Sequence, residues 1–255
     1  MRASMTGLMP VLSFPSMGLR IVRVADPVEL GRIAADLVVE TLGARGSAAF
    51  VAATGATPMP VYADLAARAR DGSFDASTLR AFQLDEYVGI SRTDRRSLTA
   101  WFDRSVAAPL GIDDERAVRF DGMADLVEGC RRYDAVAAGG LDLAILGLGP
   151  NGHLGFNEPP TGPRAPTRVV HLTPASVRSN ARYWGSEDDV PRRAITAGMA
   201  QLLSAGRVLL LVTGPHKRDI LDAVLHGPVS DDVPASHLRR HPDVVVIADV
   251  AALPP

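Results

Sequence analysis

Cysteine is almost absent from this chain, because Cys130 is the only one among its 255 residues. A lone cysteine cannot form an internal disulfide, and it leaves no CxxC pair or Cys/His cluster that could hold zinc. We therefore expect no metal site. The near-absence of cysteine also fits a reducing compartment, so we expect the protein in the cytoplasm.

Net charge and long apolar runs are also in short supply. The chain has 27 basic and 29 acidic residues, which leaves a net charge of −2. A near-neutral chain lacks the basic surface that is typical of a nucleic-acid-binding protein. No run reaches the roughly 18 apolar residues that a membrane-spanning helix needs. We therefore expect neither nucleic acid nor a membrane as a partner.

The N-terminal stretch has no charged residue between Arg2 and Arg20. Such a stretch could be a secretory signal, but Pro10 and Pro15 interrupt it and no clear cleavage site follows an apolar run. We expect residues 1–17 to form a disordered N-terminal extension. The alternative is that translation starts at a later methionine.

Strand and helix patterns alternate along the rest of the chain. Short apolar runs predict strands at 19–24, 48–53, 79–84, 141–147, 168–172, 207–213 and 244–248. Helical spacing of apolar residues appears at 28–42, 58–70, 97–106, 123–138 and 194–205, and from 217 to 225. Such alternation is typical of an α/β protein with a buried parallel sheet. We expect a single-domain, Rossmann-like, doubly wound fold over 18–253, with a mostly parallel sheet, helices on both faces and a small lid insert at about 160–185.

Polar clusters directly follow four of the predicted strands. They are Thr54–Pro58, Asp85–Gly89, Gly149–Glu158 and Thr213–Lys217. Ligands of open parallel sheets bind beyond the carboxyl ends of the strands. We therefore expect the four clusters to meet at one edge of the sheet and to form the functional site.

The first cluster is a glycine turn that leads into a helix. Backbone N–H groups at such a turn suit a phosphate, and the hydroxyls of Thr54 and Thr57, with Gly55 and Ala56 between them, add hydrogen-bond donors. The alternative is an ordinary strand-to-helix turn in which Thr57 caps the helix.

Two cations could bind the same anion. Lys217 falls in the first turn of a predicted helix, where a positive charge opposes the helix dipole unless an anion is bound nearby. Arg178 and Arg182 lie one helical turn apart in the predicted lid, and either could hold a phosphate. The alternative for each is a solvated surface residue, and for Arg178 we favour it.

The other two clusters contain residues that are suited to acid–base chemistry. Asp85 stands with Glu86 at the end of an apolar strand, where burial would raise the pKa of a carboxyl and suit it to proton transfer. Helix capping or a salt bridge is the alternative. Asn151, His153 and Glu158 share a glycine-rich loop, in which Glu158 could fix the tautomer of His153. The alternative is a loop histidine whose hydrogen bonds are satisfied.

Six segments together resemble the glucosamine-6-phosphate deaminase family. They are TGATP (54–58), LDEYVG (84–89), LGLGPNGHLGFNEP (146–159), SNAR (179–182), VTGPHK (212–217) and PASHLRRHPDVVVIAD (234–249). They occur in that family's order and spacing. The wider superfamily includes 6-phosphogluconolactonases and sugar-phosphate isomerases, but the lactonase pattern of DER followed by GHTAS is missing here.

The resemblance implies the conversion of glucosamine 6-phosphate to fructose 6-phosphate and ammonia, without a metal or redox cofactor. By position, Asp85 matches the family's proton carrier between C2 and C1. His153 matches the ring-opening base, and Glu158 matches its supporting carboxylate. Asn151 stands where some members carry Asp and others Asn, and it brings no negative charge. Phosphate ligands are implied at Arg182, at Lys217 and in the turn from Thr54 to Thr57.

Other features leave alternatives open. Members with allosteric activation carry an arginine and a lysine two residues apart, whereas this chain has Arg168 and Val170. We therefore expect a monomer or a homo-oligomer without that activation. Other possible functions are a galactosamine-6-phosphate isomerase, a 6-phosphogluconolactonase, and a non-catalytic sugar-phosphate sensor. A sensor could dispense with Asp85 and His153, and both are present.

Overall fold

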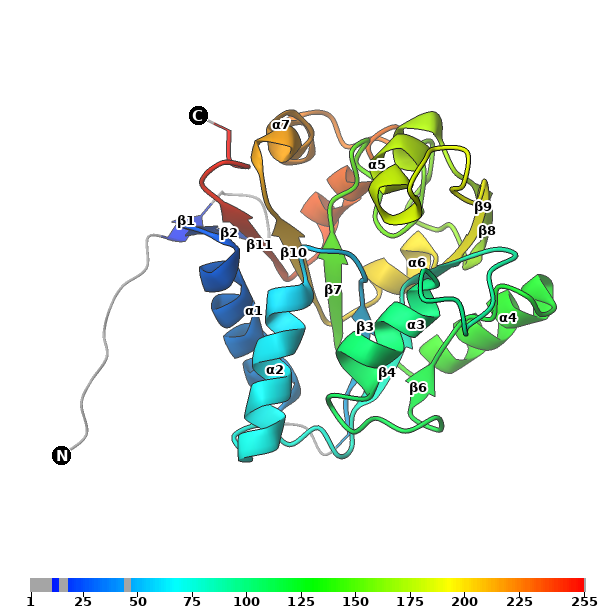
Figure 1. The fold of residues 1–255 in the computed structure, drawn as a ribbon. Coiled ribbons are helices and arrows are strands. Elements are labelled where there is room, and N and C mark those ends of the chain that lie inside the picture. Colours follow the sequence, from blue (N-terminus) through cyan, green and yellow to red (C-terminus); the bar gives the residue numbers. More distant parts are fainter. Residues whose placement is uncertain (1–10, 14–17, 44–46, 255) are drawn as a thin grey trace.

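The computed structural model describes residues 11–13, 18–43 and 47–254 (Figure 1). Its strands are β1 (Val11–Ser13), β2 (Leu19–Val24), β3 (Ala49–Ala52), β4 (Arg80–Gln83), β5 (Asp85–Tyr87), β6 (Ala117–Val118), β7 (Leu143–Gly147), β8 (Arg168–His171), β9 (Arg193–Thr196), β10 (Arg207–Val212) and β11 (Val244–Asp249). Its α-helices are α1 (Pro27–Leu42), α2 (Met59–Asp71), α3 (Leu98–Phe102), α4 (Leu126–Ala137), α5 (Pro174–Trp184), α6 (Met199–Leu203) and α7 (Arg218–His226). A π-helical turn, η1 (Asp103–Ala107), extends α3, and 3₁₀ turns form η2 (Pro215–Lys217) and η3 (Pro234–Arg240).

The larger sheet has the strand order β1-β2-β11-β10-β7-β3-β4-β6. All neighbouring strands in it run parallel except β1 and β2. This confirms the expected doubly wound, mostly parallel sheet. It also places the carboxyl ends of β3, β7 and β10, which are neighbours, at one edge.

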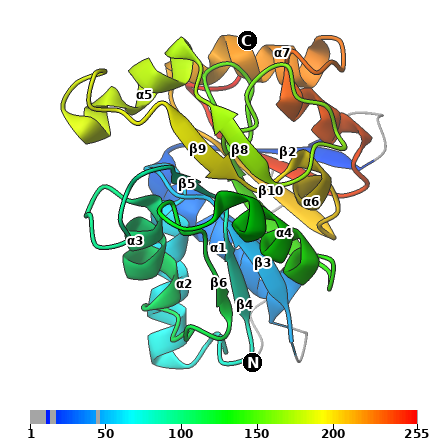
Figure 2. The same cartoon turned by 90° about the vertical axis from the view of Figure 1, so that its right-hand side faces the viewer.

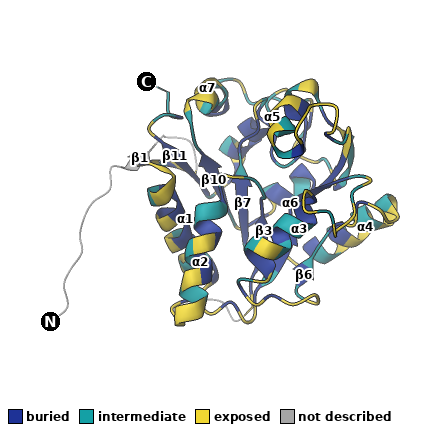
Figure 3. Cartoon of the chain, viewed as in Figure 1, coloured by how far each residue is buried: buried dark blue, intermediate teal, exposed yellow. Residues whose placement is uncertain are grey.

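Alternating side chains of the central strand β7 face two separate apolar cores. Leu143 and Ile145 pack with residues of α1, α2 and α3 on one face. Ala144 and Leu146 pack with residues of α4, α6 and α7 on the other. Both faces of β7 are therefore dry, which explains why its sequence is continuously apolar. Figure 3 shows the buried strands between helices whose outer faces are exposed.

A second, smaller sheet has the order β5-β9-β8 and is antiparallel (Figure 2). The sequence did not predict it. The expectation of one helix over 194–205 is wrong, because the segment starts as β9 and only then forms α6. The apolar residues of this segment belong to two elements. Those of β9 lie in the smaller sheet, and those of the short helix α6 pack against the larger sheet. The pairing of Asp85 with Thr196 in this sheet positions a predicted site residue.

The expected lid, residues 160–185, contains β8 and α5. Trp184 and Val177 of α5 pack in a third apolar cluster with Tyr87 and Phe156. The Tyr87 and Trp184 rings meet edge to face, with centroids 5.2 Å apart. This small apolar core holds the segment in place over the carboxyl ends of the strands. Movement of the segment as a lid stays a prediction.

The expected N-terminal extension, residues 1–17, falls mostly outside the described residues. The described part, Val11–Ser13, forms β1 and pairs with β2, which differs from the expected disorder. No helix in the described part of the chain is long and apolar enough to cross a membrane.

Candidate active site

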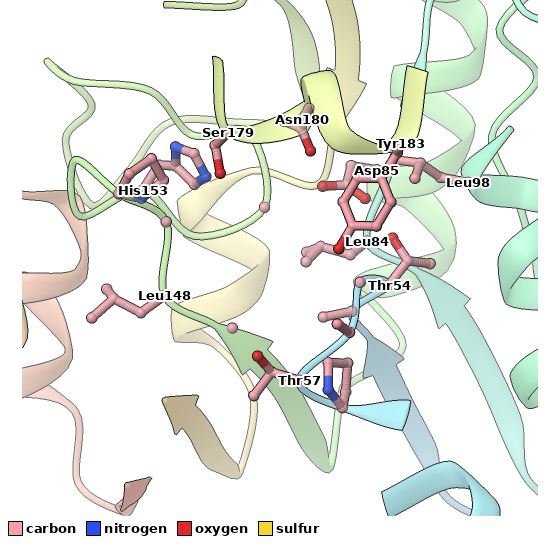
Figure 4. Close-up of a pocket in the computed structure, with 18 of the residues that line it drawn as sticks. Thr54, Thr57, Leu84, Asp85, Leu98, Leu148, His153, Ser179, Asn180 and Tyr183 are labelled. Atoms are coloured by element: carbon pink, nitrogen blue, oxygen red, sulfur yellow. The ribbon is translucent and has the colours of Figure 1, made fainter. Parts of the chain in front are cut away.

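A cavity of about 660 Å³ lies beyond the carboxyl ends of β3, β7 and β10, beside β5 and under α5 (Figure 4). All four predicted clusters contribute residues to its wall: Thr54–Pro58 from the first, Asp85 and Tyr87 from the second, Gly149, Pro150, His153, Gly155 and Phe156 from the third, and Thr213, His216 and Lys217 from the fourth. The sequence therefore predicted correctly that the four clusters meet. Asn151 and Glu158 do not line the cavity.

Asp85 is a buried carboxyl in the cavity wall, with 6% of its surface exposed. Its Oδ1 atom has no hydrogen-bond partner among the described residues. Burial, and secondarily the neighbouring charge of Glu86, raises the pKa of Asp85 from 3.8 to about 8. At neutral pH, Asp85 of the unliganded protein is therefore mostly protonated, and it can exchange its proton near neutrality.

Glu86 is also buried, but it faces away from the chemistry. Its carboxylate accepts hydrogen bonds from the N–H groups of Tyr87, Leu98 and Thr99 at 2.7–3.0 Å, and from the Ser97 hydroxyl at 2.9 Å. Three of these donors lie at the N-terminus of α3. Helix capping, the alternative considered for this pair of acids, is thus the role of Glu86 and not of Asp85.

His153 is held from behind by Glu158. The Nδ1 atom of His153 lies 3.3 Å from Oε2 of Glu158, and both side chains are largely buried. Burial alone would raise the pKa of Glu158, but hydrogen bonds, the largest from His153, outweigh it and lower that pKa to about 2. An ionised carboxylate can only accept a hydrogen bond, so Nδ1 carries the hydrogen and Nε2 is the basic nitrogen.

Asn151 supports the same carboxylate. Its Nδ2 donates to Glu158 Oε2 at 2.7 Å, and its Oδ1 accepts from the backbone N–H of His153 at 3.3 Å. Asn151 therefore orients the histidine and the glutamate together and makes no direct contribution to the cavity wall. The close approach of the loop depends on Gly149, because a Cβ atom there would lie 2.0 Å from the His153 ring.

The floor of the cavity is a turn rich in hydroxyls and N–H groups. Gly55 adopts a φ of 106°, which favours glycine, and α2 begins just beyond the turn. Thr57 does not cap α2. Its hydroxyl instead meets that of Thr213 at 3.1 Å and joins the loops after β3 and β10. The N-terminus of α2 thus has no side-chain cap, and it remains available to an anion.

Two cations face this floor. Lys217 and Arg182 both line the cavity, although they come from η2 and α5. Burial, and secondarily the charge of Arg182, lowers the pKa of Lys217 from 10.5 to about 8. Burial and the charges of Lys217 and Arg182 also lower the pKa of His216. Neighbouring positive charges that lower the pKa of Lys217 and His216 would stabilise a bound anion. Arg178, by contrast, is exposed and does not line the cavity, as expected.

The sequence did not single out an aromatic part of the wall. Arg96 lies 4.6 Å above the Trp184 ring, and the Trp101 and Tyr183 rings lie 5.3 Å apart. These pairs join the segment after β5 to α5. No sequence motif marks Arg96 or Trp101. The helical spacing at 97–106 predicted only that Trp101 lies in a helix and that Arg96 comes just before it.

The site has two chemically distinct parts. One holds the acid–base groups Asp85 and His153, and the other holds Lys217, Arg182 and the uncapped turn before α2. Their location at the carboxyl ends of a parallel sheet is typical of an α/β enzyme that acts on a small anionic substrate.

Comparison with known proteins narrows this class. The profile of the family described as glucosamine-6-phosphate isomerases/6-phosphogluconolactonase matches residues 28–247. The glucosamine-6-phosphate deaminase of Cutibacterium acnes is 41% identical over 237 residues, covering 92% of this chain and 91% of that protein. The one from Streptomyces avermitilis is 40% identical, with 92% and 91% covered. The chain belongs to the glucosamine-6-phosphate isomerase/6-phosphogluconolactonase family.

Solved structures agree with the sequence matches. A structure described as a monomeric glucosamine-6-phosphate deaminase superposes with a TM-score of 0.88 at 35% identity, covering 91% of this chain and 98% of that one. The 6-phosphogluconolactonase of Thermotoga maritima superposes with a TM-score of 0.72 at 20% identity, covering 90% and 98%. The second likeness shows the shared fold alone.

Proposed function

We propose that this protein is a glucosamine-6-phosphate deaminase, which converts glucosamine 6-phosphate and water to fructose 6-phosphate and ammonia. The observation that carries the proposal is the buried carboxyl of Asp85. Its Oδ1 has no hydrogen-bond partner within the described ranges, and it lies across the cavity from His153 (Figure 4). The relatives that carry this name support the same assignment.

Asp85 is the proton carrier in this proposal. Conversion of an aldose to a ketose moves a proton from C2 to C1 of the open chain, and one carboxyl placed over both carbons can do this. A pKa of about 8 makes Asp85 a stronger base than an exposed carboxylate, and its proton is readily returned. After this transfer, water replaces the C2 nitrogen and ammonia leaves.

His153 opens the sugar ring. Ring opening of a hemiacetal removes a proton from the C1 hydroxyl and delivers one to the ring oxygen, and a near-neutral imidazole can do both. Glu158 holds the hydrogen of His153 on Nδ1, which leaves Nε2 to exchange protons with the sugar. Asn151 keeps Glu158 in place and completes the set of catalytic-loop residues.

The phosphate of the substrate is assigned to the cationic part of the site. The turn formed by Thr54, Gly55, Ala56 and Thr57 provides N–H and hydroxyl donors, and Lys217 and Arg182 provide positive charge. This remote binding energy positions the sugar carbons over Asp85. We expect no metal or redox cofactor, because proton transfer and hydrolysis account for the whole reaction.

Assembly and location follow less directly. We infer a monomer or a homo-oligomer, and the structural relative described as monomeric favours the monomer. A cytoplasmic location is supported by the low cysteine content. Sedimentation of the purified protein would determine the assembly.

The test is release of ammonia and fructose 6-phosphate from glucosamine 6-phosphate, with galactosamine 6-phosphate beside it. Equal release of both products by the native protein, lost in Asp85→Asn, is the expected result. Asp75→Asn is the matched control, since Asp75 is exposed and its carboxylate accepts a hydrogen bond from the Ser77 N–H in a local turn. Faster turnover of galactosamine 6-phosphate would identify that sugar as the substrate. Binding of either sugar without turnover would support a non-catalytic sensor instead.

A further inference from the structure

The first turn of α5 touches the groups that set the protonation of His153. Thr173, the N-cap of α5, accepts from the backbone N–H of Ser176 at 3.3 Å. Its Oγ1 also lies 3.0 Å from Glu158 Oε2 and 3.2 Å from Asn151 Nδ2. One hydroxyl therefore both starts the helix and contacts the carboxylate that orients the histidine.

The hydrogen-bonding capacity of Thr173 fixes the direction of these contacts. A hydroxyl has one hydrogen to donate and can accept two. Asn151 Nδ2 and the Ser176 N–H are donors, so they occupy both acceptor positions. The single hydrogen of Thr173 goes to Glu158, which is ionised and lies closer than the Ser176 hydroxyl, at 3.0 Å against 3.3 Å.

Ser176 acts on the histidine directly. It is fully buried, and its Oγ lies 3.3 Å from His153 Nδ1, as does Glu158 Oε2. Two oxygens thus converge on Nδ1. Ser176 also helps to lower the pKa of Glu158. The Oγ of Ser176 can accept a hydrogen bond from Nδ1, so both oxygens favour a hydrogen on that nitrogen.

We propose that Thr173 and Ser176 are positioning residues that hold His153 in its Nδ1–H tautomer and couple that tautomer to the placement of α5. The same helix places Ser179, Asn180, Arg182 and Tyr183 in the cavity wall. Figure 4 shows Ser179 and Asn180 above the space between His153 and Asp85. Seating of α5 over the cavity therefore also readies the ring-opening base. The kinetic part of this inference rests on the proposed deaminase function.

The kinetic test compares Thr173→Val, which keeps the shape and removes the hydroxyl, with Thr173→Ser, which keeps the hydroxyl. We expect Thr173→Val to lower kcat at least about tenfold, since general acid–base groups contribute roughly 100- to 10,000-fold. Its KM should change less than its kcat, because Lys217 and the turn before α2 are untouched and only Arg182 of the phosphate ligands lies on α5. Thr173→Ser should restore kcat. Thr41→Val is the control for a general loss of stability. Thr41 lies in α1, outside the cavity wall, and its hydroxyl donates to the Leu37 carbonyl and accepts from Arg207 of β10.

A second measurement needs no turnover. Nitrogen-15 NMR of the imidazole distinguishes a protonated from an unprotonated ring nitrogen, and a His153→Gln sample assigns the signals. We expect Nδ1–H in the native protein, and a mixture of tautomers in the Thr173→Val, Ser176→Ala double variant. A native Nε2–H tautomer, or an unchanged kcat in Thr173→Val, would overturn the inference. Absence of turnover by the native protein would instead overturn the proposed function, and the NMR result would still decide the tautomer.

Discussion

Asp85 and Glu86 are adjacent buried carboxyls with opposite hydrogen bonding. Glu86 accepts four hydrogen bonds, three of them from residues 97–99, whereas Oδ1 of Asp85 has no partner among the described residues. Strand β5 alternates its side chains, so the two acids face opposite sides. One side is a capped helix, and the other is the cavity. The charge of Glu86 adds to the burial that raises the pKa of Asp85.

This arrangement predicts a stability cost that grows with pH. The pKa of Asp85 is about 8 in the folded protein, against 3.8 for an ordinary Asp. Between these values Asp85 is ionised in the unfolded chain but keeps its proton in the folded state. The free energy of unfolding therefore falls as pH rises towards 8. Asp85→Asn cannot ionise. The stability of this variant relative to the native protein should therefore increase from pH 5 to pH 8, by on the order of 1 kcal/mol per pH unit.

Urea unfolding of both proteins at several pH values, without ligand, measures this difference. Other titrating groups are common to the two proteins and cancel, as does any fixed cost of the amide. Parallel stability curves would show that Asp85 ionises normally in the folded state. The gain in stability should come with loss of turnover, as is common when a buried catalytic group is replaced.

Prediction from the sequence succeeded where the residues of a single strand were enough to show how that strand is buried. The continuous apolar runs of β7 and β10 required a buried parallel sheet, and that topology brought Asp85, His153 and Lys217 together. It failed where partners lie elsewhere in the chain. Nothing local in Asp85-Glu86 indicates which acid caps α3, because the α3 donors to Glu86 stand eleven or more residues away, and Oδ1 of Asp85 has no partner in the described part of the chain.

The small sheet was missed for a related reason. Strand β5 has three residues and β9 has four, too few to show a period. Their apolar side chains divide between two cores: Tyr87 and Ala194 pack in the cluster that contains α5, whereas Ile195 packs in the core that contains α4. Arg96 and Trp101 were missed because their significance comes only from Trp184 and Tyr183, more than eighty residues later.

The rate profile should show Asp85 on its acidic side. Proton removal from C2 requires the carboxylate form, and kcat/KM reports the free enzyme. We therefore expect kcat/KM for glucosamine 6-phosphate to rise with pH to about 8, because the pKa of Asp85 is about 8. Binding of inorganic phosphate, measured by calorimetry over the same range, involves no carbon acid. After correction for the ligand's own titration it should lack this rise. A kcat/KM that is already maximal at pH 6 would contradict the assignment.

Lys217 should govern anion binding on the alkaline side. Burial and Arg182 lower the pKa of Lys217 to about 8, so the unliganded protein loses this charge at higher pH. Inorganic phosphate should bind the native protein about tenfold more weakly at pH 9 than at pH 7, apart from the ligand's own titration. Lys217→Arg keeps its charge and should remove most of this difference, whereas Lys217→Met should bind weakly at both pH values. Equal pH dependence in the native protein and Lys217→Arg would assign the titration to another group.

Gly149 offers the sharpest test of how the catalytic loop is built. A Cβ atom at this position would lie 2.0 Å from Cδ2 and 2.1 Å from Nε2 of His153, distances that no packed structure tolerates. Gly149→Ala must therefore push the ring away from Glu158 or distort the loop. We expect kcat to fall by about 100-fold or more, the scale of a lost general base.

The matched control is Gly129→Ala in α4, which does not line the cavity. A Cβ atom there would meet only Ile195 Cδ1, at an ordinary 3.8 Å, and Gly129 does not have a positive φ. Kinetics of both variants with glucosamine 6-phosphate, and calorimetry with inorganic phosphate, separate the two parts of the site. Gly149→Ala should lose turnover and keep phosphate binding within about threefold, since Lys217 and Arg182 belong to other elements. Full activity in Gly149→Ala would mean that His153 can leave its place against Glu158 without consequence, and the role of His153 as ring-opening base would then be untenable.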